Sequence, residues 1–336
     1  RRVAGREMRF SLAPAARPYV SCTDRCHTKL SKLWRRCHDA AADGDGEDKD
    51  SQLQHDVYCV LTRYATMAGE GYQAALPDSP FGVLARRLGV TTECFASPLN
   101  CTLDEWHSAF PDTDGPFGSL GSFFDAELLE GSFEANPPFV PEVMSAMASR
   151  IEAALNAADA AGRALSFAVF VPVWGKVRAW GLLRGSQYLV EWFEIPAKDH
   201  AYINGAQHRS HTRHRPSSFG TGVFLLQSAA GRRRWPVSEA VVAELREAME
   251  GTAAKLGATN TIAKWEQVAR ERGGAVASGP AQRGQRNVGG AEAGGAAAFK
   301  NACRTAWAAL DDSARAEYRG SWRAFLKARS AAVGAS

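Results

Sequence analysis

The stretch Leu165-Ser166-Phe167-Ala168-Val169-Phe170-Val171 is the part of the sequence that indicates the fold most directly. An apolar run of this length suits a central strand that is buried on both faces of a sheet. Further strands are predicted at residues 188–195 and 222–226, and apolar spacing predicts a helix at residues 240–249. Strands that alternate with helices predict an α/β fold with a largely parallel sheet covered on both faces.

The same alternation continues towards the N-terminus. Residues 91–96 predict the first strand, a loop rich in Pro, Gly and Asp follows, and residues 131–135 lead into Asn136-Pro137-Pro138-Phe139. Pro141 then suits the first turn of a helix. That helix carries an apolar stripe formed by Val143, Met144, Met147, Ile151 and Leu155. We therefore expect residues 91–250 to form the sheet domain.

Residues 1–90 predict an N-terminal helical region. Alternating apolar residues indicate a short strand near residues 8–12, and residues 40–50 predict a solvated loop. Apolar side chains at helical spacing predict helices at residues 28–36, 57–67 and 81–88. Gly89 is expected to cap the last of these helices.

The C-terminal part differs in composition. Residues 251–298 predict a helix tail followed by a linker rich in Gly and Ala, and residues 299–330 predict a small helical hairpin. The hairpin weakly resembles the second half of an HMG box, so a nucleic-acid-binding module is the alternative interpretation.

Composition limits the class of protein. A chain of 336 residues with 45% hydrophobic and 23% charged residues is typical of a globular protein, and its net charge of +4 indicates no particular partner. The longest apolar run, residues 165–174, is far shorter than the ~20 residues that a membrane-spanning helix needs. No transmembrane segment is expected. Because the first residue is Arg, we interpret the chain as a fragment of a longer one.

Seven cysteines in a chain of this size favour a reducing, intracellular setting. Five potential metal ligands lie close together in the sequence: Cys22, Cys26, His27, Cys37 and His38. Their spacing matches no closed zinc pattern, and the residues between them have helical spacing. Thiols on a helix surface are the favoured interpretation, zinc is the alternative, and no metal site is predicted.

The tetrapeptide Asn136-Pro137-Pro138-Phe139 suits methylation of a planar amine. The amine of adenine is a poor nucleophile because its lone pair is delocalised into the ring. The Asn136 amide oxygen and the Pro137 carbonyl can accept its two protons and so localise the lone pair. Phe139 can stack on the base, and the prolines stiffen the backbone. The same logic would fit adenine in DNA or a protein glutamine, and a Pro-Pro pair alone is usually a loop.

Longer blocks resemble one family in order along residues 8–245, the cap-specific adenosine N6-methyltransferases of the phosphorylated C-terminal-domain interacting factor. The blocks are residues 93–101 (ECFASPLNC), 109–115 (AFPDTDG), 131–139 (GSFEANPPF), Ser166-Phe167, Phe170-Val171-Pro172, Trp174, Gly205, Gln207-His208 and residues 224–227 (FLLQ). The resemblance covers the methyltransferase core without the WW domain of animal members. It implies a Rossmann-like class I methyltransferase sheet.

The resemblance also implies an activity, which is transfer of a methyl group from S-adenosylmethionine to N6 of the 2′-O-methyladenosine next to a messenger-RNA cap. The expected partners are capped RNA that begins with adenosine and, through regions outside this chain, the phosphorylated C-terminal domain of RNA polymerase II. No membrane partner is expected. Such a substrate implies a nuclear location.

Site residues follow by position. Asn136, Pro137, Pro138 and Phe139 would be catalytic, and Ser97, Pro98, Asn100 and Asp112 would bind the cofactor, with Asp114 as an alternative to Asp112. Trp174 would stack on the cationic methylated guanine, and Glu142, Arg213 and Arg215 would also contact the substrate. The basic run from Arg209 to Arg215 could equally be a solvated face.

Two departures from the family pattern keep other functions open. The family commonly has Glu where this chain has Pro141, with an acid one residue later at Glu142, and an acid where this chain has Val173. A catalytically silent capped-RNA-binding protein, or an amino methyltransferase acting on another adenine substrate, are the alternatives.

Overall fold

A computed structural model describes residues 2–4, 7–10, 20–38, 46–67, 74–205, 208 and 213–253. The chain divides into two compact units, Arg1–Ile262 and Ala263–Ser336, and all described residues belong to the first. The predicted linker and C-terminal hairpin therefore lie outside the described residues. None of the helices in the described part is long and apolar enough to cross a membrane.

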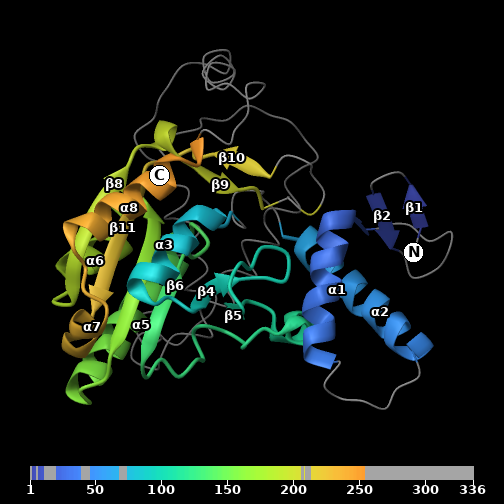
Figure 1. Ribbon diagram of the computed structural model, residues 1–336, viewed down its shortest axis with the longest axis horizontal. Helices are drawn as coiled ribbons and strands as arrows, with labels where there is room; N and C mark the ends of the chain where they lie inside the picture. Colours follow the sequence, from blue (N-terminus) through green and yellow to red (C-terminus); the bar gives the residue numbers. More distant parts are fainter. Residues whose placement is uncertain are drawn as a thin grey trace, which may run out of the picture. The chain divides into compact units, whose positions relative to one another are not determined.

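A six-stranded sheet forms the centre of this unit, in the order β5-β4-β6-β7-β11-β8 (Figure 1). Its strands are β4 (Thr92–Ala96), β5 (Glu105–Ser108), β6 (Gly131–Ala135), β7 (Leu165–Pro172), β8 (Leu189–Ile195) and β11 (Thr221–Gln227). β5, β4, β6 and β7 are mutually parallel, whereas β11 is antiparallel to both β7 and β8. The predicted α/β fold is confirmed, and the sheet is mixed. The chain leaves β8 and turns back to form β11 beside it. Such a return makes an antiparallel pair and needs no crossover from one end of the sheet to the other, which a parallel pair would require.

β7 is buried along its whole length, as the apolar run predicts. Phe167, Val169 and Val171 belong to a core with α5 (Pro141–Ala160) and α6 (Arg178–Gly185). Ala168 and Phe170 belong to a second core with α3 (Asp78–Leu88) and α8 (Glu239–Glu250). Side chains alternate between the faces of a strand, so these two cores cover the two faces of the sheet.

α3 ends as the sequence predicts. Gly89 has a φ of 62°, and its N–H donates to the Leu84 carbonyl, which closes the last turn. Although α3 lies within the first 90 residues, Phe81, Leu84 and Leu88 pack in the core that covers the sheet. Within the first 90 residues, the helices and strands before α3 contribute no buried residue to that core.

Those earlier elements form a small antiparallel sheet, β1 (Arg2–Ala4), β2 (Glu7–Phe10) and β3 (Val20–Thr23), and two helices, α1 (Asp24–His38) and α2 (Gly46–Ala65). α2 begins at Gly46, so the loop predicted to reach residue 50 is shorter. Trp34 and Tyr64 share a third core with Trp106 of β5. The described cysteines form no disulfide, and no three His, Cys, Asp or Glu residues of the described part cluster as metal ligands.

Short elements complete the unit. They are α4 (Pro111–Asp114), η1 (Gly115–Phe117), η2 (Ala197–Asp199), β9 (Ala201–Ile203), β10 (His214–Pro216) and α7 (Ala229–Arg234). β9 pairs with β10, and Ala75 bridges to Ile203 from the segment before α3. β5 and α4 occupy part of the predicted loop after residue 96, which corrects that prediction.

Candidate functional site

The loops after β4 and β6 meet at a point where the direction of strand addition reverses. β5 lies on one side of β4 and β6 lies on the other, and all three strands are parallel. In open α/β sheets, ligands bind outside the carboxyl ends of strands at such a switch point. The loop after β4 begins at Ser97 and the loop after β6 begins at Asn136. The structure therefore brings two of the predicted groups of site residues to one place.

Asn136 has an unsatisfied acceptor at this point. Only 6% of the residue is exposed, and its Nδ2 donates a 2.9 Å hydrogen bond to the Ala74 carbonyl. That bond fixes the orientation of the amide, because the carbonyl can only accept. Asn136 Oδ1 is buried and receives no hydrogen bond from any described residue. A buried unsatisfied polar atom costs about 1–3 kcal/mol, so a ligand that donates a proton there would recover this energy.

The rest of the tetrapeptide completes the arrangement. The Pro138 carbonyl accepts a 2.7 Å hydrogen bond from the Val140 N–H. Within the described part of the chain, no group donates to the Pro137 carbonyl. Two acceptors on consecutive residues are therefore available for the two protons of one amine.

Two aromatic side chains contact Phe139, and a third contacts one of these two. Its ring makes edge contacts with Tyr202 at 5.8 Å and with Trp174 at 6.4 Å between ring centroids. Trp174 makes a further edge contact with Phe219, which is 39% exposed. These residues follow β6, β7 and η2 or precede β11, so the carboxyl edge of the sheet carries an aromatic surface that is open to solvent at Phe219.

Trp174 also carries an unsatisfied group. Its Nε1 is buried and has no hydrogen-bond partner among the residues that the structure covers. The predicted substrate residue thus lies next to Phe139, within 6.4 Å between ring centroids, with a donor available.

The predicted cofactor residues after β4 form a closed turn. Asn100 Oδ1 accepts hydrogen bonds from the Ser97 N–H at 2.7 Å and from Ser97 Oγ at 2.9 Å. The Ser97 carbonyl in turn accepts from the N–H groups of Asn100 and Cys101. Pro98 is buried within the turn. Because these polar groups form hydrogen bonds with one another, they would influence a bound ligand mainly through the shape that they give the loop.

Asp112 and Asp114 have different environments. Asp112 is exposed and forms an ion pair with Arg63 of α2. Asp114 is buried, and its Oδ2 accepts a 2.7 Å hydrogen bond from the Tyr64 hydroxyl. Burial raises the pKa of Asp114 to about 6, although the Tyr64 hydrogen bond lowers it.

A buried carboxylate pair lies within the sheet beside the two loops. Glu93 of β4 and Glu134 of β6 are register partners. Glu93 Oε1 accepts hydrogen bonds from the N–H groups of Thr102 and Leu103, at 2.5 and 2.6 Å. Burial raises the pKa of Glu93 to about 7. Burial and the Glu93 charge raise the pKa of Glu134 well above its ordinary value.

The remaining predicted substrate residues are more dispersed. Glu142 is half-buried in the first turn of α5. Arg213 donates to both carboxylate oxygens of Asp78, at 2.8 and 2.7 Å, so its guanidinium joins the start of α3. Arg215 is half-buried in β10. Arg209 and His211 lie outside the described residues.

Sequence reasoning missed three residues behind Phe139. The Tyr202 hydroxyl and His200 Nε2 both lie within hydrogen-bonding distance of Thr221 Oγ1, at 2.7 and 2.8 Å, and all three residues are buried. Tyr202 supports one edge of Phe139. Their signal in the sequence is weak, because η2 and β9 are three residues each and show no periodicity.

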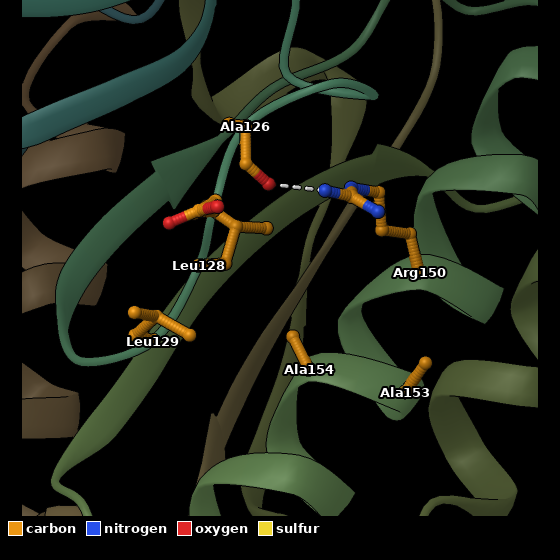
Figure 2. Close-up of a pocket in the computed structure, with 7 residues that line it drawn as sticks. Ala126, Leu128, Leu129, Arg150, Ala153 and Ala154 are labelled. Atoms are coloured by element: carbon orange, nitrogen blue, oxygen red, sulfur yellow. Dashed lines mark hydrogen bonds between the residues drawn. The ribbon is translucent and has the colours of Figure 1, made fainter.

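A hollow also lies at the opposite edge of the sheet, where β6 begins. A hollow of about 390 Å³ lies between the segment before β6 and α5, lined by Leu128, Leu129 and Arg150 among others (Figure 2). It lies at the amino end of β6, whereas Asn136 follows the carboxyl end. The candidate site is therefore defined by its chemistry and strand topology.

The matches to known proteins cover the part of the chain that contains this site. Residues 29–205 match the family described as "Phosphorylated CTD interacting factor 1 WW domain", from α1 through β9. The mouse protein named "mRNA (2'-O-methyladenosine-N(6)-)-methyltransferase" is 39% identical over 216 residues, 61% of this chain and 30% of the relative. The human protein of the same name is 38% identical over 229 residues, 65% of this chain and 32% of the relative. The chain thus spans less than a third of the length of these relatives. Since the matched residues make up more than half of it, the chain belongs to the phosphorylated CTD interacting factor 1 WW domain family.

Proposed function

We propose that this chain is an RNA adenine-N6 methyltransferase that uses S-adenosylmethionine as methyl donor. Its substrate would be the 2′-O-methyladenosine next to the cap of messenger RNA, as the names of the mouse and human relatives state for those proteins. The observation that supports the proposal most strongly is the buried Asn136 Oδ1, an acceptor without a donor at the switch point of the sheet.

The chemistry follows from two acceptors on adjacent residues. Asn136 Oδ1 and the Pro137 carbonyl would accept the two protons of the adenine amine, which turns its lone pair towards the methyl group. S-adenosylmethionine supplies a methyl group on a positively charged sulfur, which is the electrophile. Phe139 would stack on the base, and the edge contact with Tyr202 holds the Phe139 ring in place. An adenosine at the start of an RNA needs no extraction from a duplex.

The sheet supports the finer assignment to the Rossmann-like class I methyltransferases. Parallel strands on both sides of a switch point provide the place for a nucleoside cofactor at the carboxyl ends of β4 and β5. The turn from Ser97 through Pro98 to Asn100 would form one wall of the cofactor site. Asp112 would accept the ribose hydroxyls after leaving Arg63, a change of small cost because that ion pair is exposed.

The residues present fit such a cofactor. The acceptor of Asn136 is neutral and the acids Asp112 and Asp114 follow β5, which suits a positive sulfonium. The cations at these loops, Arg63 and Lys29, are paired with Asp112 and the Cys101 carbonyl. The aromatic surface supports recognition of the cap, since a Trp face attracts a cationic methylated guanine. Glu142 follows Phe139 and Arg215 precedes Phe219 closely in the sequence, and both are proposed as further substrate contacts. Arg213 would act through its ion pair with Asp78.

The proposed substrate implies a nuclear location. A link to the phosphorylated C-terminal domain of RNA polymerase II is supported only by the name of the family.

The test compares Asn136→Ala with the wild type on RNAs that begin with adenosine, capped or uncapped, using methyl-labelled S-adenosylmethionine. We expect label at adenine N6 of capped RNA, and a loss of at least a hundredfold in the variant. Asn156→Ala is the matched control, because it removes the same amide from an exposed position on α5 away from the site, where Asn156 Oδ1 accepts hydrogen bonds from Gln187 and Tyr188. Equal labelling of uncapped RNA would contradict cap specificity. Tight binding of capped RNA without methylation would support the silent alternative.

A further inference from the structure

Two adjoining hollows lie at the amino edge of the sheet, away from the candidate site. The first, of about 390 Å³, is lined by Ala126, Glu127, Leu128, Leu129, Arg150, Ala153 and Ala154 (Figure 2). The second, of about 330 Å³, has among its lining residues Glu105, His107, Leu120, Glu127 and Glu130. They share Ala126, Glu127 and Leu128, and we name the two hollows together the amino-edge surface.

Apolar side chains are unusually exposed there. Leu120 is 56% exposed and Leu129 is 49% exposed. Apart from Phe219, they are the exposed large hydrophobic residues of the described part of the chain. A single exposed leucine is ordinary, but two on the rims of adjoining hollows form a patch of the kind that contacts other proteins.

The polar groups of the amino-edge surface are mainly acidic. Glu105, Glu127 and Glu130 are all exposed, and within the described residues neither Glu127 nor Glu130 forms an ion pair. The nearby cation, Arg150, is already engaged: its guanidinium donates to the carbonyls of Phe123 and Ala126. Figure 2 shows Arg150 directed at the Ala126 carbonyl. The surface therefore attracts positive charge.

His107 gives an independent indication of a ligand. It lines the second hollow and is 6% exposed, and its Nδ1 is buried without a hydrogen-bond partner among the described residues. Burial lowers the pKa of His107, which favours the neutral ring, and a neutral imidazole has one nitrogen that can accept a hydrogen bond. A donor that enters the hollow would satisfy such a nitrogen.

We propose that the amino-edge surface binds an extended basic peptide of a partner protein. A Lys or Arg side chain of the peptide enters the second hollow between Glu105, Glu127 and Glu130, and an apolar neighbour covers Leu129. The carboxylates disfavour nucleic acid, whose phosphates they would repel. The inference does not depend on the proposed methyl transfer, because Asn136 lies at the opposite ends of the strands.

The probe is a fluorescein-labelled peptide, Gly-Leu-Lys-Gly-Lys-Leu-Gly, and a second peptide with Glu in place of both Lys is its control. Fluorescence anisotropy at low ionic strength measures binding to the full chain. We expect saturable binding of the basic peptide and none of the acidic one. No saturation by the wild type below about 1 mM, which corresponds to about −4 kcal/mol, or equal binding of the acidic peptide, overturns the proposal.

Variants then locate the site. Glu127→Gln/Glu130→Gln removes two carboxylates, and Leu129→Ser removes the apolar rim; all three side chains are exposed, so the fold should tolerate both changes. Each variant should weaken binding at least fivefold. Glu239→Gln/Glu247→Gln makes the same change in net charge on α8 and should leave binding unchanged. An equal loss in the α8 variant would show attraction by net charge alone and would overturn the assigned surface.

Discussion

The Tyr64 hydroxyl donates a 2.7 Å hydrogen bond to Asp114 Oδ2, and both side chains are buried. This bond joins α2 to the segment after β5, and Ser97 lies within hydrogen-bonding reach of the same hydroxyl. Lys29 of α1 donates to the Cys101 carbonyl just beyond the Ser97 turn. The N-terminal helices therefore hold both loops of the proposed cofactor site.

Tyr64→Phe tests this connection. The substitution keeps the ring but removes the Tyr64 donor from Oδ2 of the buried Asp114, while the Thr113 hydroxyl still donates to Oδ1, so the free energy of unfolding should fall by about 1–3 kcal/mol. Urea denaturation measures the change. Tyr58→Phe, on the same helix and less buried, should change stability by less than about 0.5 kcal/mol. An equal effect of the two variants would contradict a specific role of the hydroxyl.

Glu93→Gln should make stability less dependent on pH. The folded-state pKa of Glu93 is about 7 against an ordinary value of 4.5, so the native state holds a proton that the unfolded state releases. Wild-type stability should therefore fall as pH rises from about 4.5 to 7. The Gln amide oxygen can still accept from Thr102 and Leu103 without a charge. Between pH 4.5 and pH 8 the variant should therefore lose less stability than the wild type.

Denaturation of both proteins at pH 4.5, 6 and 8 measures this difference. Glu239→Gln, on the exposed start of α8, should follow the wild type at each pH. A constant offset between Glu93→Gln and the wild type would show that burial of the Glu93 charge does not limit stability.

Phe139→Ala should reduce methyl transfer more than Phe139→Tyr. Loss of stacking on a base costs about 1–3 kcal/mol, which corresponds to a fall in kcat/KM of about 5- to 150-fold. The Tyr variant keeps the ring and its edge contacts with Trp174 and Tyr202. Steady-state kinetics on capped RNA checks both variants. Equal kinetics of the Ala variant and the wild type would exclude stacking on Phe139.

Trp174→Phe separates the ring from its N–H group. If Trp174 recognises the cap by stacking alone, the Phe variant should keep most of the preference for capped over uncapped RNA. A loss comparable to that of Trp174→Ala would assign recognition to the buried Nε1, which has no partner among the described residues. The measurement is the ratio of kcat/KM values for the two RNAs.

Arg213→Ala and Asp78→Ala should have similar effects on stability. The two side chains form a bidentate ion pair that is partly exposed, so the coupling free energy should be about 0.5–1 kcal/mol in a double-mutant cycle. RNA affinity, measured by filter binding at two salt concentrations, distinguishes the roles. If Arg213 contacts phosphate, its loss alone should weaken RNA binding and reduce the salt dependence.

The sequence by itself determined the elements whose signals are local. The apolar run of β7, the first-turn Pro141 of α5 and the cap at Gly89 all depend on neighbouring residues, and the structure confirms them. β5 escaped prediction because an edge strand of four residues has little propensity signal of its own. The residue pattern placed Asn136 between a strand and a helix, but its hydrogen bonds were not readable from the sequence.

Only the tertiary structure decided the environment of the site. Ala74, 62 residues before Asn136, takes the amide nitrogen and leaves the oxygen unsatisfied. Tyr202 contacts Phe139 and Tyr64 donates to Asp114, and the residues of each pair are likewise far apart in the sequence. Periodicity reports which face of an element is buried, not which distant segment covers it. Strand order and packing fix that choice, and here they place an acceptor without a donor at the edge where the parallel strands diverge.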